Sequence, residues 1–212
     1  MRGDAMKSTE LDVWPLPKFH AGDAKHLHAV GVISLTFVQF ERGVEGLFLH
    51  HPSQEVMPRD LVYRYFYALS EEQRLKAIRA YYKDHEEDEI VRSAVGKVLE
   101  LFDWAHDARN KILHSELYPP GLAGRRDTFY LIKRAGKREP GSIYLAFTLP
   151  ELRGVAERMR EGVVAAAEIH MHLRYRETDP SHLPESVRVY AARPPSFRTL
   201  EIPNMLKATE AP

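Results

Sequence analysis

Apolar residues recur at alternating intervals of three and four positions in three long stretches of the chain. The stretches run from about Asp23 to His50, from about Val91 to Ile112, and from about Leu149 to Arg176. This spacing puts the apolar side chains on one face of an α-helix, so we predict three long amphipathic helices. The residues on their apolar faces are Val30, Ile33, Phe37, Phe40, Val44 and Leu47 in the first, Val91, Val95, Val98, Phe102, Ala105 and Ile112 in the second, and Leu152, Val155, Met159, Val163, Ala166, His170 and Leu173 in the third.

Charged residues mark the parts of these helices that we expect to face solvent. In the first helix, Glu41, Arg42 and Glu45 lie on the side opposite the apolar face. The acids from Glu86 to Glu89 precede the apolar pattern of the second helix. Negative charge there complements the positive end of the helix dipole, so we expect a solvated acidic turn.

Two shorter helices are predicted between the first two long ones. Pro58 suits the first position of a helix over residues 58–68. The run Ser70-Glu-Glu-Gln73 has the capping-box pattern, so the next helix extends from Ser70 to about His85. Their apolar residues are Leu61, Val62, Tyr65, Phe66 and Leu69 in the first, and Leu75, Ile78 and Tyr82 in the second.

The segment before the last long helix predicts a β-hairpin over about residues 128–148. Thr128–Lys133 and Ser142–Thr148 are rich in aliphatic and aromatic residues and flank a glycine-containing basic segment. Residues 1–22 and 177–212 contain prolines and show no period. We therefore predict an N-terminal arm (1–22), a helical domain (23–176) and an extended C-terminal tail (177–212). The fold class is mainly α, a bundle of four to five helices with a hairpin before the last long helix.

Composition narrows the class of protein. The 212 residues suffice for one domain with appendages, or for two small domains. Lys and Arg together number 30, as do Asp and Glu, so a nucleic-acid contact would have to be a local patch. The chain has no cysteine, which excludes disulfides, zinc–thiolate sites and thiol catalysis. It has no membrane-length apolar run and no signal-peptide core, so we expect a soluble, cytoplasmic protein.

A dense group of polar and charged residues ends the second long helix, between Trp104 and Glu116. It contains the pattern Arg109-Asn110-x-x-x-His114. At these residues the chain resembles the HEPN superfamily, small helical-bundle proteins that share an Arg, a polar residue and a His four to six positions after the Arg. Asn directly after Arg matches the commonest form of that motif. The resemblance covers the architecture of about residues 23–176 and, as a sequence match, the motif alone.

The helical geometry of the motif raises a question about how its residues meet. On a regular helix Asn110 and His114 share the polar side, whereas Arg109 lies on the apolar face near Phe102 and Ile112. Arg109 and His114 would then be well separated. Either the helix ends near residue 113 and frees His114, or the residues come from two copies of the chain. The HEPN resemblance implies a homodimer in which two motifs line one cleft.

The resemblance also implies a reaction, the cleavage of RNA. His114 would handle the proton of a 2′-hydroxyl, because imidazole titrates near neutrality. Arg109 would hold the scissile phosphate and stabilise its growing negative charge, and Asn110 would orient His114 or the phosphate. His106 and Asp107 would support them. The product would be a 2′,3′-cyclic phosphate, and no metal or other cofactor is required.

Purely structural roles for the same residues stand beside this interpretation. A buried arginine needs a partner, so Arg109 would pair with Asp107, Glu100 or an acid from another helix. His114 would cap the last carbonyls of its own helix.

Other candidate sites have weaker patterns. His170 and His172 would share a face only on a strand, so a core role for His170 is favoured over a metal site. The pairs His26/His28 and His50/His51 have no nearby acids at ligand spacing. Basic residues around the hairpin form a candidate phosphate-contact surface, with an ordinary solvated loop as the alternative. These residues are Arg125, Arg126, Lys133, Arg134, Lys137 and Arg138.

The sequence therefore favours an enzyme, a HEPN-like, metal-independent endoribonuclease that acts as a homodimer on RNA. A toxin or phage-defence setting is expected, with an antitoxin or another protein as a further partner. The alternative is a non-catalytic HEPN-like binding or assembly module, whose tail or hairpin engages a protein or RNA partner. A third hypothesis, a helical metal-binding protein, would require bound metal after purification.

Overall fold

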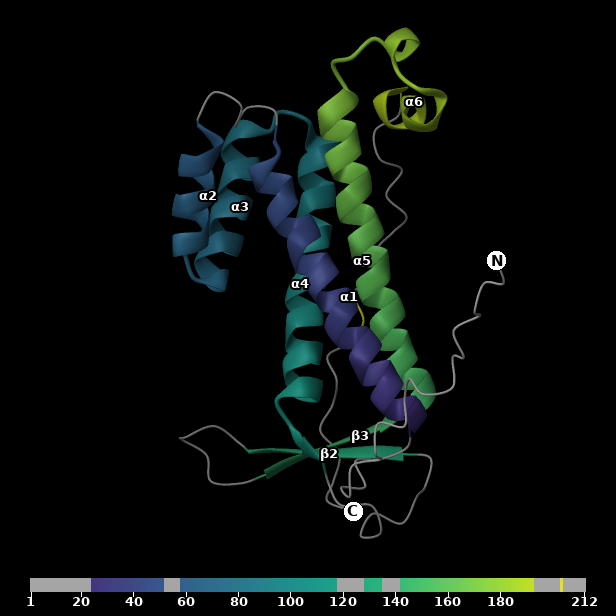
Figure 1. Ribbon diagram of the computed structural model, residues 1–212. Helices are drawn as coiled ribbons and strands as arrows, with labels where there is room; N and C mark the ends of the chain where they lie inside the picture. Colours follow the sequence, from purple (N-terminus) through teal and green to yellow (C-terminus); the bar gives the residue numbers. More distant parts are fainter. Residues whose placement is uncertain (1–23, 52–57, 118–127, 135–141, 193–202, 204–212) are drawn as a thin grey trace, which may run out of the picture.

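The computed structural model describes residues 24–51, 58–117, 128–134, 142–192 and 203. The chain is mainly helical, with a hairpin before the last long helix, as the sequence predicts. In Figure 1 the three long helices lie side by side, two of the shorter helices lie together on one side of them, and the sheet lies at one end. The elements are α1 (Ala24–Leu49), α2 (Arg59–Ala68), α3 (Glu71–His85), α4 (Glu89–Leu113), β1 (Glu116–Leu117), β2 (Thr128–Arg134), β3 (Ser142–Thr148), α5 (Leu149–Tyr175) and α6 (Glu185–Ala192).

The predicted apolar faces of the long helices form one core. α1 packs most extensively against α5, and α4 packs against both. Three phenylalanine rings meet where α1 crosses α4: Phe37 stacks on Phe102 at 5.4 Å between ring centroids, and Phe40 contacts Phe102 edge-on at 5.2 Å. All three rings are buried. Because α1 and α4 are held by these rings, the end of α4 has a fixed position relative to α1.

A glycine sets how closely α5 approaches α1. Gly162 lies on the buried side of α5, directly against the ring of Phe40. A Cβ atom there would lie 2.5 Å from Cε1 and 2.7 Å from Cε2 of that ring, well inside van der Waals contact. Glycine is therefore required for the observed helix spacing.

Side-chain caps explain where three of the helices begin. Ser70 and Gln73 form the predicted capping box at α3, in which the Gln73 backbone N–H donates to Ser70 Oγ at 3.3 Å. Thr148 forms a second capping box at α5. Asp88 Oδ1 accepts from the backbone N–H of Ile90 at 2.8 Å and begins α4. These bonds satisfy backbone donors that have no partner within their own helix.

The sheet has three antiparallel strands in the order β1-β2-β3, one more than the predicted hairpin. In the β2–β3 pair, Phe129 lies opposite Phe147 and Leu131 opposite Leu145, and all four side chains are buried. The added strand, β1, is two residues long and pairs with Leu131 and Ile132 of β2. Its shortness explains why no alternating pattern predicted it.

Several predictions about exposure are wrong. Glu45 is buried rather than solvated, because it accepts hydrogen bonds from Arg74 and from the hydroxyl of Tyr67. Glu86, expected in a solvated turn, is also buried. Among the described side chains of α2, only those of Val62 and Phe66 are buried. The other apolar residues predicted on its apolar face, Leu61, Tyr65 and Leu69, are exposed.

The prediction of an extended tail is wrong for part of its length, because residues 185–192 form α6, which packs against α5. The rest of the tail after residue 192, apart from residue 203, lies outside the described residues, as does the predicted arm over residues 1–22. Leu183, just before α6, is buried and fixes this return of the chain.

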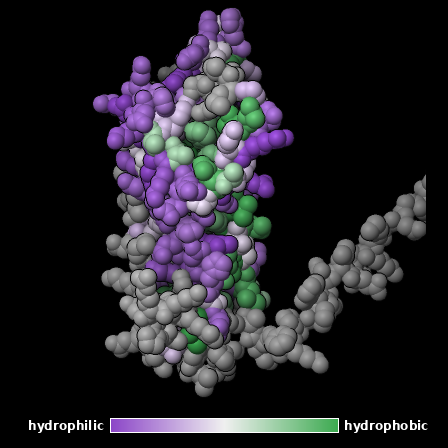
Figure 2. All heavy atoms as spheres, turned by 90° about the vertical axis from the view of Figure 1, so that its left-hand side faces the viewer, coloured by the Kyte–Doolittle hydropathy of each residue, from purple (hydrophilic) through white to green (hydrophobic). Residues whose placement is uncertain are grey.

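An exposed apolar stripe runs along α1. Leu27, Leu35 and Val38 are 41%, 70% and 43% exposed, and their spacing places them on one side of the helix. Figure 2 shows hydrophobic residues gathered along one edge of a face that is otherwise mostly hydrophilic. None of the described helices combines the length and the apolar character that a bilayer crossing requires.

Candidate functional site

The end of α4 brings His114 back toward Arg109. α4 ends at Leu113, and His114 has φ −98° and ψ 14°, outside the regular helical range. The Ser115 hydroxyl donates to the carbonyl of Lys111, and Glu116 then enters the sheet by pairing with Ile132. The first interaction caps a carbonyl of the last turn, and the second takes the chain out of the helix and into the sheet. The first of the two arrangements considered from the sequence, a helix that ends near residue 113, is therefore the observed one.

Arg109, Asn110 and His114 are in direct contact within one chain. Nη1 of Arg109 donates to Asn110 Oδ1 at 2.8 Å and to His114 Nε2 at 2.9 Å. A guanidinium can only donate, so Nε2 of His114 accepts, and the ring is neutral with its proton on Nδ1. Arg109 and Asn110 are half-buried, whereas His114 is exposed. An unprotonated imidazole nitrogen and a fixed cation therefore lie together at the surface.

An aromatic floor from α1 supports Arg109. The guanidinium carbon lies 5.6 Å from the ring centroid of Phe37, within the range of a cation–π contact. Within the described part of the chain, Arg109 makes no ion pair with Asp107, Glu100 or any other acid, so the structural pairing considered from the sequence is not observed. Both of its hydrogen bonds use Nη1, so the donors on Nη2 and Nε face no acceptor among the described residues.

His106 extends this group toward α3. Its Nε2 lies 3.4 Å from Glu71 Oε1, and Nδ2 of Asn110 lies 3.3 Å from its Nδ1 and 3.1 Å from its Nε2. His106 and Glu71 form an ion pair when the imidazole carries a proton. The ring also lies 6.1 Å from Phe37, so one aromatic side chain supports both His106 and Arg109.

The structure does not join Asp107 to this group. Asp107 lies 2.8 Å from Lys111 Nζ, one turn along the same helix. By contrast, Glu71 contacts His106, and Phe37 contacts both His106 and Arg109, although the sequence did not assign either residue to the site. Glu71 belongs to a capping-box segment and Phe37 to an apolar face, so neither carries a signal beyond its role in its own helix.

Acidic residues of α1 border the site on the side of α3. Burial raises the pKa of the Glu41 carboxyl, and the neighbouring Glu45 and Glu71 raise it further, against the opposing charges of Arg74 and Arg109. Arg74 pairs closely with Glu45 and lies 3.9 Å from Glu41. The positive charge of Arg109 is thus partly balanced from one side without a direct ion pair.

The basic residues predicted around the hairpin form no described surface. Arg125, Arg126, Lys137 and Arg138 lie outside the described residues. The backbones of Lys133 and Arg134 belong to β2, where they pair with Ile143 and Ser142. Their role as a phosphate-contact surface stays a prediction.

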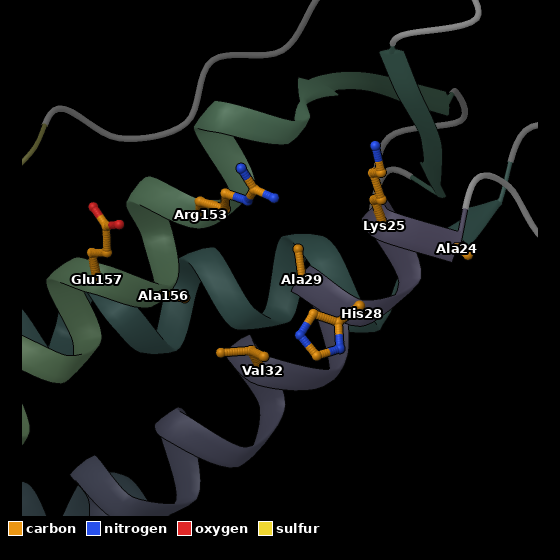
Figure 3. A pocket seen from close by; sticks show the side chains of 8 residues that line it. All are labelled: Ala24, Lys25, His28, Ala29, Val32, Arg153, Ala156 and Glu157. Atoms are coloured by element: carbon orange, nitrogen blue, oxygen red, sulfur yellow. The ribbon is translucent and has the colours of Figure 1, made fainter.

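A separate, open pocket of about 430 Å³ lies between the first turns of α1 and α5 (Figure 3). Its polar lining comes from Lys25 and His28 on α1, and from Arg153 and Glu157 on α5. Ala29, Val32 and Ala156 supply apolar surface. It shares no lining residue with the group around Arg109.

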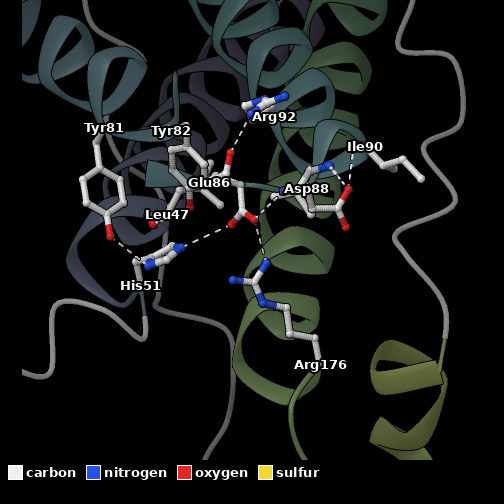
Figure 4. A network of polar contacts seen from close by, with 10 residues as sticks. Leu47, His51, Tyr81, Tyr82, Glu86, Asp88, Ile90, Arg92 and Arg176 are labelled. Carbon is white, nitrogen blue, oxygen red and sulfur yellow. Dashed lines mark hydrogen bonds and ion pairs between the residues drawn. The ribbon is translucent and has the colours of Figure 1, made fainter. Parts of the chain in front are cut away.

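A buried polar network joins four helices at the opposite end of the bundle (Figure 4). Glu86 accepts from Arg176 at 2.9 Å and from the backbone N–H of Asp88 at 3.1 Å, and it lies 3.5 Å from His51 Nε2. Burial raises the pKa of the Glu86 carboxyl, but these three hydrogen bonds together hold it below its ordinary value. Burial lowers the pKa of His51, against the opposing effect of Glu86. The Tyr81 hydroxyl donates to His51 Nδ1 at 2.9 Å.

This network has a structural role, because it holds helices together. Every polar group in it has a partner, and it ties the end of α1, the turn between α3 and α4, and the end of α5 together. The carbonyl of Glu86 also accepts from Arg92 at 2.9 Å. A satisfied buried network of this kind fixes one arrangement of helices.

The rival histidines are dispersed. His172 is buried, whereas His170 is half-buried against His50, with 5.5 Å between ring centroids. Burial and the neighbouring His50 lower the pKa of His170. In the described ranges, no three potential metal-binding side chains gather at one point. The core role predicted for His170 belongs instead to His172, two positions further on.

Comparisons of the chain with protein-family models, with curated proteins and with solved structures found no match. The description of the site therefore rests on its own geometry. That geometry defines a helical bundle with a surface group of one cation and two histidines at the end of α4.

Proposed function

We propose that this chain is a HEPN-like, metal-independent endoribonuclease that acts as a homodimer in the cytoplasm, in a toxin or phage-defence setting. One observation carries the proposal, namely the 2.9 Å contact between Arg109 Nη1 and His114 Nε2. It supports a site in which a phosphate-binding cation and a proton acceptor act on the same substrate. The family setting and the homodimer come from the resemblance of the motif.

The reaction follows from the positions of these groups. The unprotonated Nε2 of His114 takes the proton of an RNA 2′-hydroxyl, and the 2′-oxygen forms a bond to the adjacent phosphorus. The free donors of Arg109 bind the phosphate oxygens and stabilise the charge that grows on them. The bond from phosphorus to the 5′-oxygen then breaks, and that oxygen leaves with a proton. The products are a 2′,3′-cyclic phosphate and a 5′-hydroxyl.

The exposed stripe of α1 supports the homodimer within this proposal. Leu27, Val38 and Leu35 point roughly 80°, 100° and 160° around the helix from Phe37, the ring that supports Arg109. An exposed apolar surface on the helix that supports the motif suits an interface between two copies of the chain. Analytical ultracentrifugation of Leu35→Glu against the unaltered chain tests this part alone. A dimer that persists unchanged in the variant contradicts this choice of interface.

Cleavage of RNA in EDTA tests the enzymatic proposal. The unaltered chain should cut RNA and leave cyclic-phosphate ends, whereas His114→Ala should lose about 10²- to 10⁴-fold in rate, as loss of general-base catalysis does. His114 is exposed, so the variant should stay folded, which circular dichroism checks. His182→Ala, another exposed histidine, is the matched control and should keep full activity. Equal cleavage by all three proteins contradicts the proposal.

The second candidate is a non-catalytic HEPN-like binding or assembly module. The exposed apolar residues of α2 favour it, since Tyr65 and Tyr67 are 72% and 51% exposed. This function predicts no cleavage by any variant and a loss of partner binding when residues 177–212 are deleted. Because α6 packs against α5, the deletion needs a thermal melt as a folding control.

A further inference from the structure

We propose that His106, oriented by Glu71, is the general acid of the site and acts opposite His114. This inference rests on the proposed ribonuclease function and assigns the second proton transfer of that reaction. The cleavage moves two protons, one away from the 2′-hydroxyl and one onto the departing 5′-oxygen. His114 supplies a nitrogen for the first, and the second needs a group that holds a proton when the substrate binds.

The two histidines have opposite surroundings. His114 faces the guanidinium of Arg109 and has no carboxylate partner within the described residues, so it is arranged as a proton acceptor. His106 lies 3.4 Å from the carboxylate of Glu71, and a proton on its ring completes an ion pair there. A carboxylate that holds one imidazole nitrogen fixes the direction of the other and stabilises the imidazolium.

Both ring nitrogens of His106 lie beside the polar group of the motif. Nδ2 of Asn110 is 3.3 Å from Nδ1 and 3.1 Å from Nε2. When the ring is protonated, both nitrogens are donors, as is the amide nitrogen, so the ring needs an acceptor besides Glu71. The 5′-oxygen of a bound substrate supplies that acceptor.

The phosphate-binding group lies between the two histidines. Asn110 bonds His106 through Nδ2 and Arg109 through Oδ1, and Arg109 bonds His114. A phosphate on the free donors of Arg109 thus has a histidine on either side along α4. The side chains of His106 and Glu71 are 39% and 36% exposed, so a substrate can reach them.

The protons and electron pairs of the cleavage step balance without another reactant. His114 gains the proton of the 2′-hydroxyl as the bond from the 2′-oxygen to phosphorus forms. The electron pair of the breaking bond goes to the 5′-oxygen, which takes a ring proton of His106. Glu71 keeps its charge throughout and is a positioning residue.

A sulfur-substituted substrate distinguishes the general acid from the general base in a cleavage assay. The cleavage site is first mapped in an oligoribonucleotide, and the 5′-oxygen that leaves there is then replaced by sulfur. A thiolate is a much weaker base than an alkoxide and leaves without a proton. His106→Ala should therefore lose about 10²- to 10⁴-fold on the oxygen substrate and under about 10-fold on the sulfur substrate. His114→Ala should be impaired on both.

Glu71→Gln tests the positioning role by the same readout. It should be impaired on the oxygen substrate and spared on the sulfur substrate, a difference that a general loss of structure would not produce. Glu72→Gln is the matched control, because Glu72 is exposed on the same turn and, among the described residues, pairs with Lys76 alone. This control should cleave both substrates at the unaltered rate.

The other outcomes overturn the inference in distinguishable ways. Equal losses by His106→Ala on both substrates exclude a role as the general acid. Full activity of that variant on the oxygen substrate removes His106 from the reaction while the proposed function stands. Failure of the unaltered chain to cleave either substrate overturns the proposed function, and this inference with it.

Discussion

Replacement of Gly162 by alanine should destabilise the bundle, although alanine is the better helix former. The new methyl group would meet the Phe40 ring at 2.5 Å from Cε1 and 2.7 Å from Cε2, whereas carbon atoms in contact normally lie about 3.5–4.0 Å apart. The ring would have to retreat by about 1 Å. It is fully buried and held edge-on by Phe102, so it has no free space to enter.

The magnitude follows from two opposing effects. Overpacking a core costs about 1–3 kcal/mol, and the short contacts put Gly162→Ala near the upper end. Alanine recovers about 1 kcal/mol of helix propensity relative to glycine. The net loss in unfolding free energy is about 1–2 kcal/mol, which for a chain of this size lowers Tm by about 2–8 °C.

Gly154 provides the matched control in the same helix. A Cβ there meets no described atom within 4 Å, so Gly154→Ala should gain about 0.5–1 kcal/mol from propensity alone. Thermal melts by circular dichroism, with urea titrations, compare the two variants. A Gly162→Ala protein that melts at or above the unaltered chain refutes the close approach of α1 and α5.

Three further predictions concern stability. Arg176→Met should cost about 2 kcal/mol in urea unfolding, because it strands the buried Glu86 carboxylate, although Arg176 itself is 24% exposed and partly screened. The unfolding free energy should fall as the pH drops below 6.5, because burial lowers the pKa of His51 and His170, so the unfolded chain binds protons that the folded chain does not. Thermal melts between pH 7.5 and 5.5 measure this decline. The decline should be shallower in His51→Gln, and the part that stays in this variant is due to His170. Thr148→Ala should cost about 1 kcal/mol by removing the cap of α5, and no change in the urea midpoint would contradict the role of that cap.

The long helices could be predicted from the sequence because a wide apolar face is a repeated signal. Ile33, Phe40 and Met159 belong to series of apolar residues whose spacing places them on one face of a helix, and all three are fully buried. The capping box at Ser70 was equally readable, since it depends on residues three positions apart. These features are local, so local sequence specifies them.

Features that depend on contacts between helices could not be predicted in this way. Glu45 and Glu86 read as solvated acids, yet arginines from other helices, Arg74 and Arg176, bury and pair them. The contact between Glu71 and His106 joins α3 to α4 in the same manner. Charge alone does not reveal the partner, because the pairing depends on how the helices pack.

The motif lies between these two cases. Its residues were identified from spacing, but on an ideal helix Arg109 and His114 point apart. They meet because α4 ends at Leu113 and the chain enters β1, a two-residue strand without a sequence signal of its own. The spacing of the motif therefore identified the residues, and the end of the helix brings their side chains together.

The packing of α1 against α5 has a consequence for synthesis of the protein. The helix that covers most of the buried face of α1, α5, is translated only after α2, α3, α4 and the sheet. Until then Ile33 and Phe40 lack their main cover, and the nascent chain carries an apolar surface of the kind that chaperones bind. Because α1 and α5 are far apart in the sequence, their packing also makes folding slow relative to bundles in which consecutive helices are neighbours. A chain interrupted before Leu149 would be left with an open core, and proteases would be expected to remove it.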